Sequence, residues 1–134
     1  MQDFKRLRVW HLAHELSLEV IEALSVPVVR RIPGLRTQAV SAATSVAANL
    51  AEGCARPGRA EFLRFVGIAL GSVNELESHL GLARRANTLN TETHANLMTR
   101  LNLVRRMLIS LMRVLEQQIA ADENRSRQDA GRAS

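Results

Sequence analysis

Hydrophobic residues recur every three or four positions in four successive stretches, and no stretch alternates apolar and polar residues as a half-buried strand would. The four stretches cover residues 7–24, 35–54, 58–83 and 90–119. Short segments with proline, glycine or asparagine separate them. The pattern predicts an all-α chain of four helices, each roughly 17 to 30 residues long, folded as an up-down-up-down antiparallel four-helix bundle.

Small residues mark the second and third of these helices. The second stretch is rich in alanine and serine, which predicts a central helix with close neighbours, ending near Gly53. In the third stretch Gly67 and Gly71 lie one turn apart, and each costs a helix about 1 kcal/mol relative to alanine. We therefore expect a close helix crossing at these two glycines. Glu61 follows Gly58 by three residues and is expected to cap the first amides of this helix.

The length of 134 residues suits one domain. Residues 1–121 are predicted to form the bundle. Residues 122–134 have no apolar period and are expected to form a flexible polar tail. The longest stretch without a charged residue, 37–51, has 15 residues, and a membrane span needs about 20. No signal peptide is recognisable, so we expect a cytoplasmic protein with no membrane partner.

No pattern of catalytic or metal-binding residues is found. Glu75 precedes His79 by four residues, whereas di-iron bundles use Glu-x-x-His. His11 and His14 lack a recognisable third ligand, and His94 stands alone. Cys54 has no histidine nearby in sequence and is expected to behave as a small apolar residue. The sequence thus predicts no enzyme, no metal and no cofactor.

Arginine dominates the basic residues, with 17 arginines and one lysine, and the net charge is +5. In an up-down-up-down bundle the first and third turns lie at the same end. Five arginines flank these two turns: Arg30, Arg31, Arg36, Arg84 and Arg85. No acidic residue occurs between Glu22 and Glu52 or between Glu77 and Glu92. We therefore expect an arginine-rich end without nearby carboxylates, suited to phosphate.

Several segments resemble a known family. They include Phe4-x-x-Leu7-x-Val9-Trp10, the block Ser45-Val46-Ala47-Ala48-Asn49-Leu50-Ala51-Glu52-Gly53, and Glu61-Phe62-Leu63-Arg64-Phe65. Together they resemble the bacterial four-helix-bundle proteins encoded by intervening sequences of 23S ribosomal RNA genes, a family that includes accessory proteins of diversity-generating retroelements. The resemblance implies a ring-shaped homo-oligomer, typically a pentamer, with no established enzymatic activity. The retroelement members bind nucleic acid together with a reverse transcriptase.

Two functional hypotheses follow. The first is a non-enzymatic, ring-forming oligomer whose arginine-rich end binds RNA or DNA, beside a nucleic-acid enzyme. The second is a structural or adaptor oligomer for a protein partner, without nucleic-acid binding. Both need structural or subunit-contact residues, and six are proposed for this role: Asn49, Glu52, Gly53, Glu61, Gly67 and Gly71.

Overall fold

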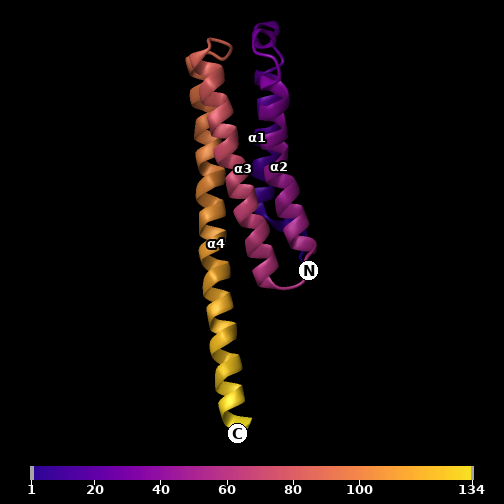
Figure 1. Ribbon diagram of the computed structural model, residues 1–134, viewed down its shortest axis with the longest axis vertical. Coiled ribbons are helices and arrows are strands. Elements are labelled where there is room, and N and C mark those ends of the chain that lie inside the picture. Colours follow the sequence, from indigo (N-terminus) through magenta and orange to yellow (C-terminus); the bar gives the residue numbers. More distant parts are fainter. Residues whose placement is uncertain (1, 134) are drawn as a thin grey trace.

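The computed structural model describes residues 2–133, and this part of the chain is helical with no strand. The helices are α1 (Arg8–Ala23), α2 (Leu35–Ala55), α3 (Arg59–Arg85) and α4 (Thr91–Ala133). Short 3-10 helices at Phe4–Arg6 and Pro27–Arg31 precede α1 and α2. The helices run alternately up and down (Figure 1). The predicted all-α four-helix bundle is therefore confirmed.

Each helix packs on two neighbours. α1 and α3 both pack against α2 and α4, so α1 and α3 occupy diagonal corners of the bundle. The core comes from one apolar stripe on each helix, with Leu16, Leu50, Leu76 and Leu101 at most 1% exposed. Burying a leucine side chain contributes about 1.5–3 kcal/mol, so these stripes supply much of the stability.

The close helix approach lies between α2 and α3 at Gly53. A Cβ atom there would sit 2.8 Å from the Cβ of Phe65 and 3.0 Å from the Cδ1 of Phe62. The predicted helix over residues 35–54 is confirmed and ends one residue later, at Ala55. Gly53 is buried within its last turn. Its role is to admit the aromatic side chains of α3.

The predicted close crossing at Gly67 and Gly71 is absent from the bundle. A Cβ at Gly67 would approach only the Cε of Met112, at 4.0 Å, and one at Gly71 would meet nothing within 4 Å. Neither glycine is fully buried. The two glycines do lie on the same face of α3, as their spacing of one turn predicts, but that face points away from the core.

The helix lengths differ from the predicted range, since α1 has 16 residues and α4 has 43. Residues 122–133, expected as a frayed tail, continue α4 as a helix that projects past the bundle (Figure 1). Extension of a packed helix avoids the costly nucleation step, which explains how a polar segment stays helical. Asp122 also pairs with Arg59 and, at 2.8 Å, with Arg125. The flexibility of this segment stays a prediction.

Candidate nucleic-acid interface

The first and third turns meet at one end of the bundle, as predicted. The 3-10 helix Pro27–Arg31 joins α1 to α2, and residues 86–90 join α3 to α4 (Figure 1). Val26 of the first turn and Leu89 of the third line the same surface pocket. Asn87 in the third turn adopts φ 59°, a left-handed conformation that asparagine tolerates better than most residues, and it reverses the chain there.

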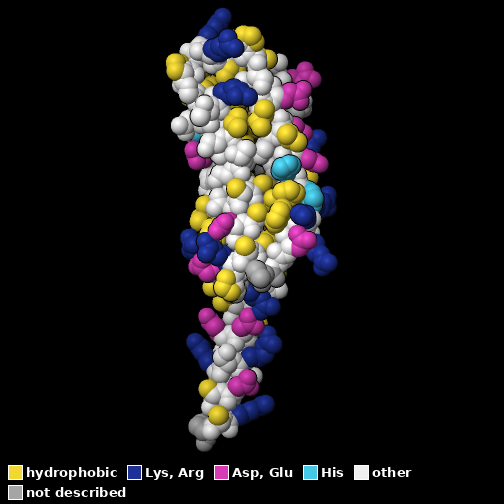
Figure 2. All heavy atoms as spheres, turned by 90° about the vertical axis from the view of Figure 1, so that its right-hand side faces the viewer, with side chains coloured by type: hydrophobic (Ala, Val, Ile, Leu, Met, Phe, Trp, Pro, Cys, Tyr) yellow, Lys and Arg dark blue, Asp and Glu magenta, His cyan; other side chains and the backbone are white. Residues whose placement is uncertain are grey.

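All five predicted arginines lie at this end and are exposed. Arg30 and Arg31 close the 3-10 helix, Arg36 lies in the first turn of α2, and Arg84 and Arg85 lie in the last turn of α3. Among residues 2–133, none of the five forms an ion pair or a side-chain hydrogen bond. Their guanidinium groups are therefore available to an external anion, and Figure 2 shows basic side chains projecting at this end.

The five arginines share an end but do not share one pocket. Arg30 and Arg36 line a cavity of about 520 Å³ between the 3-10 helix and the start of α2. Arg84 lines a second pocket, beneath the third turn, and Arg85 a third one beside Arg105. Such a spread of charges suits a long polyanion better than a small phosphorylated ligand.

The expectation of an end without carboxylates is wrong. Glu22 of α1 lines the same pocket as Arg84, and Glu92 lies in the first turn of α4. Glu92 stands where an acidic side chain favours the positive end of the helix dipole. Glu22 and Glu92 border the two stretches of sequence that lack acidic residues, and the fold brings both of them back to the turns.

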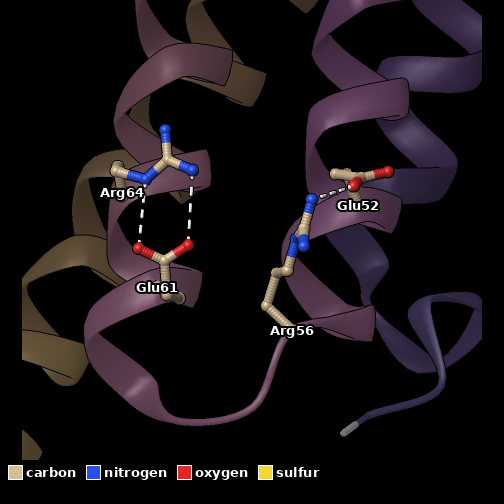
Figure 3. A network of polar contacts seen from close by, with 4 residues as sticks. All are labelled: Glu52, Arg56, Glu61 and Arg64. Atoms are coloured by element: carbon tan, nitrogen blue, oxygen red, sulfur yellow. Dashed lines mark hydrogen bonds and ion pairs between the residues drawn. The ribbon is translucent and has the colours of Figure 1, made fainter.

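At the opposite end several arginines are paired within the chain, whereas Arg6 and Arg8 are exposed and form no ion pair among residues 2–133. Arg56 donates to the carboxylate of Glu52 at 2.8 Å (Figure 3), and Arg59 pairs with Asp122. The guanidinium carbons of Arg56 and Arg64 lie 5.5 and 4.5 Å from the ring centre of Phe65. The two ends of the bundle thus differ in part: none of the five arginines at the first end is paired among residues 2–133, whereas Arg56, Arg59 and Arg64 at the second end are.

Glu61 does not act as the predicted cap. Its two carboxylate oxygens accept hydrogen bonds from Arg64 at 3.2 and 3.3 Å (Figure 3). This hydrogen bonding to the guanidinium lowers the pKa of Glu61 below its usual value. Gly58, at the N-cap, has no side chain to complete a capping box. The acidic residue in the first turn still favours the helix dipole of α3.

Asn49 has a structural role inside the chain. Its side-chain amide donates to the carbonyl of Ser45 at 2.8 Å and to the hydroxyl of Ser45 at 2.9 Å. That hydroxyl lies 2.9 Å from the hydroxyl of Ser72 on α3. The three side chains form a polar link in the α2–α3 interface, which a purely apolar pattern would not reveal.

The histidines and Cys54 do not assemble into a catalytic or metal site. No group of three or more potential metal ligands occurs within residues 2–133. His11 contacts the carbonyl of Lys5 at 2.7 Å, His14 stacks on Trp10 at 4.9 Å, and His79 lies 3.4 Å from Glu75. Cys54 is buried, and burial raises the pKa of its thiol. His94 is half-buried in the first turn of α4.

Sequence reasoning missed an apolar surface on α1. Phe4 and Trp10 are partly exposed and line a groove between α1 and α2. Leu18 is 58% exposed in the same groove. The signal was present, because Leu18 is a large apolar residue off the core stripe of its helix.

These features define the class of protein: a small antiparallel four-helix bundle with one basic end and no assembled catalytic centre within the described residues. The family model described as 23S rRNA-intervening sequence protein matches residues 5–110, so the chain belongs to this family. No curated protein matches the chain. No helix of the described chain is both long and apolar enough to cross a membrane.

A solved structure has the same fold. It is a protein of unknown function from the S23 ribosomal protein family of Bacteroides thetaiotaomicron, which is 23% identical to this chain. The match covers 78% of this chain and 97% of the other, with a TM-score of 0.71.

Proposed function

We propose that the protein is a non-enzymatic homo-oligomer, assembled as a ring, that binds RNA or DNA through its arginine-rich end. The observation that carries this proposal is the set of five exposed arginines at the first and third turns, which form no ion pair with any residue from 2 to 133. Unpaired guanidinium groups suit phosphate because their planar N–H donors match its oxygens. A ring would repeat the five arginines around one face and so strengthen the attraction.

Recognition in this proposal depends on the phosphate backbone and has little sequence preference. Base stacking on aromatic side chains needs exposed rings near the basic surface. Phe4 and Trp10 lie instead in the α1–α2 groove toward the other end, and Phe62 and Phe65 are buried. The ligand is therefore expected to bind by charge and shape. A nucleic-acid enzyme is the natural companion of such an accessory protein.

The test is a charge-removal variant, Arg30, Arg31, Arg84 and Arg85→Gln. We expect its affinity for a generic duplex or a structured RNA to fall at least about tenfold at low salt, because four phosphate contacts are lost. The matched control is Arg6, Arg8, Arg106 and Arg113→Gln, which removes the same charge from exposed arginines elsewhere. Equal weakening by both variants would show that net charge alone drives binding, and the proposal of a specific end would fail.

A second candidate is an adaptor oligomer for a protein partner. The apolar groove between α1 and α2 favours it, since such a surface suits protein contact better than nucleic acid. This candidate predicts that the purified protein binds neither duplex DNA nor structured RNA at low salt. If the wild type and the Arg6, Arg8, Arg106 and Arg113→Gln control both bind nucleic acid in a salt-dependent way, an adaptor role cannot be the whole function.

A further inference from the structure

A groove with an almost wholly apolar lining runs between α1 and α2. One wall has large residues, among them Phe4, Trp10 and Leu18, and the other has small residues of α2: Thr44, Ala48 and Ala51. The cavity volume is about 390 Å³, and no aspartate, glutamate, lysine or arginine lines it. Figure 2 shows hydrophobic side chains gathered beside histidines on this side of the molecule. Small residues on one wall allow another helix to approach closely.

A second exposed surface follows α3 on its solvent side. Its residues alternate steps of three and four, so they form one straight stripe along the helix: Ile68, Gly71, Glu75, Ser78 and Leu82, here called the outer stripe. Ile68 is 40% and Leu82 51% exposed. A Cβ at Gly71 would meet nothing within 4 Å, so the middle of the outer stripe offers room to a neighbouring helix.

Ion pairs fix the relative heights of groove and stripe along the bundle. Arg105 of α4 pairs with Glu77 of α3, and five residues earlier on α4 Arg100 pairs with Glu19 of α1 at 2.8 Å. Both α1 and α3 run antiparallel to α4. Leu82, five residues after Glu77, therefore lies near the height of Glu19.

The apolar ends of the two surfaces consequently match. Leu18 stands near the height of Leu82. At the other end Phe4 lines the groove beside Ala48 and Ala51 of α2. The contact of Ser45 with Ser72 places Ile68 of the antiparallel α3 level with this part of α2. The outer stripe from Ile68 to Leu82 is about 21 Å long, since each helical residue rises about 1.5 Å. A pair of polar groups matches as well: Glu75 on the outer stripe lies within about one helical turn of the height of His14 in the groove, where the carboxylate can accept a hydrogen bond from the imidazole N–H.

We propose that the groove between α1 and α2 binds the outer stripe of α3 from a second copy of this chain. The inference rests on the proposed homo-oligomer and names its contact surfaces. Two copies side by side, with their ends aligned, bring Leu82 to Leu18, Ile68 to Phe4 and Glu75 toward His14. Groove and outer stripe lie on different faces of one bundle, because α1 and α3 are diagonal. The contact is heterologous and leads to a ring rather than a closed dimer.

Two single substitutions separate the surfaces. Ala48→Arg fills the groove, and Leu82→Arg puts a charge on the outer stripe. Both sites are exposed, so the fold should persist, and thermal melting by circular dichroism checks this. Light scattering should show the wild type as an oligomer and each variant at the mass of one 14.8 kDa chain. Ala95→Arg, on the exposed face of α4, is the matched control and should keep the wild-type mass.

Mixing the two variants is the decisive step. Each retains one intact surface, so the outer stripe of Ala48→Arg should enter the groove of Leu82→Arg. The mixture should form a one-to-one heterodimer at twice the chain mass and nothing larger. No heterodimer, or variants that keep the wild-type mass, would overturn the inference while the oligomer itself stands. A monomeric wild type would overturn both the ring and this interface, whatever the outcome of nucleic-acid binding.

Discussion

A single glycine decides how closely α2 and α3 can pack. Gly53→Ala would place a Cβ 2.8 Å from the Cβ of Phe65, an atom that cannot move without the backbone. We expect overpacking to cost about 1–3 kcal/mol, against a gain of about 1 kcal/mol in helix propensity. The unfolding midpoint in urea should therefore fall.

Gly67→Ala is the matched control for that variant. It lies inside α3 and would meet only the flexible end of Met112, at 4.0 Å. We expect it to stabilise the protein by about 1 kcal/mol through helix propensity alone. Equal effects of the two substitutions would contradict the packing role assigned to Gly53.

Cys54 gives a second test at the residue scale. Burial, followed by the nearby negative charge of Asp3, raises the pKa of its thiol. The folded state therefore keeps its proton to a higher pH than the unfolded state. Below the pKa that the Cys54 thiol has in the unfolded chain, the neutral thiol makes its full contribution to stability. As the pH rises from that value through the higher pKa of the folded state, this contribution declines.

Cys54→Ala should remove this decline. Urea unfolding of wild type and variant between pH 7 and pH 10 is the measurement, with the difference between their stabilities shrinking at alkaline pH. Native Cys54 should also react slowly with a thiol reagent, because the reactive form is the exposed thiolate. A difference in stability that stays constant over this pH range would contradict the assignment.

At the scale of elements, the hydroxyl pair of Ser45 and Ser72 links α2 to α3 at 2.9 Å. Ser45→Ala should destabilise the protein by about 1–3 kcal/mol, since it leaves the buried hydroxyl of Ser72 without this partner. Replacing both serines by alanine should cost less than the sum of the single changes. A double-mutant cycle in urea measures this coupling, and additive costs would mean that the hydroxyls act independently.

The C-terminal part of α4 tests how far packing extends. Removal of residues 124–134 keeps Asp122 and its pair with Arg59. We expect the unfolding free energy to change by less than about 0.5 kcal/mol, because exposed ion pairs contribute little. Hydrogen exchange should be fast beyond Asp122 and slow near Leu108, which is fully buried. Slow exchange throughout residues 122–133 would contradict the predicted flexibility.

The sequence predicted the helices well and the surfaces less well, for a physical reason. Burial of stripes such as Leu76 and Leu80 follows directly from their spacing, so the four helices and their order could be derived. The close packing at Gly53 depends on where Phe65 of another helix arrives, which spacing within α2 does not reveal. The same holds for Glu22, whose position beside Arg84 arises only when α1 and α3 fold together.

At the scale of the whole molecule, ring assembly and nucleic-acid binding should be visible in one measurement. Each phosphate neutralised on B-DNA contributes about −0.9 to the slope of log affinity against log salt. The five arginines of one chain therefore allow a slope of about −4.5 at most. If several chains of a ring share one duplex, the slope of the wild type should be steeper than this limit.

The Leu82→Arg variant provides the comparison, since it should be monomeric yet keep all five arginines of the basic end. Its affinity for duplex DNA should be weaker than that of the wild type. The arginine added at position 82 makes its own contribution to the slope, which is measured by combining Leu82→Arg with the Arg30, Arg31, Arg84 and Arg85→Gln substitutions. After this contribution is subtracted, the slope of log affinity against log salt should be no steeper than about −4.5. A wild-type slope within the limit of one chain would mean that the basic ends of neighbouring subunits do not act together. In that case the ring would organise the protein without forming the binding surface, and each bundle would bind nucleic acid alone.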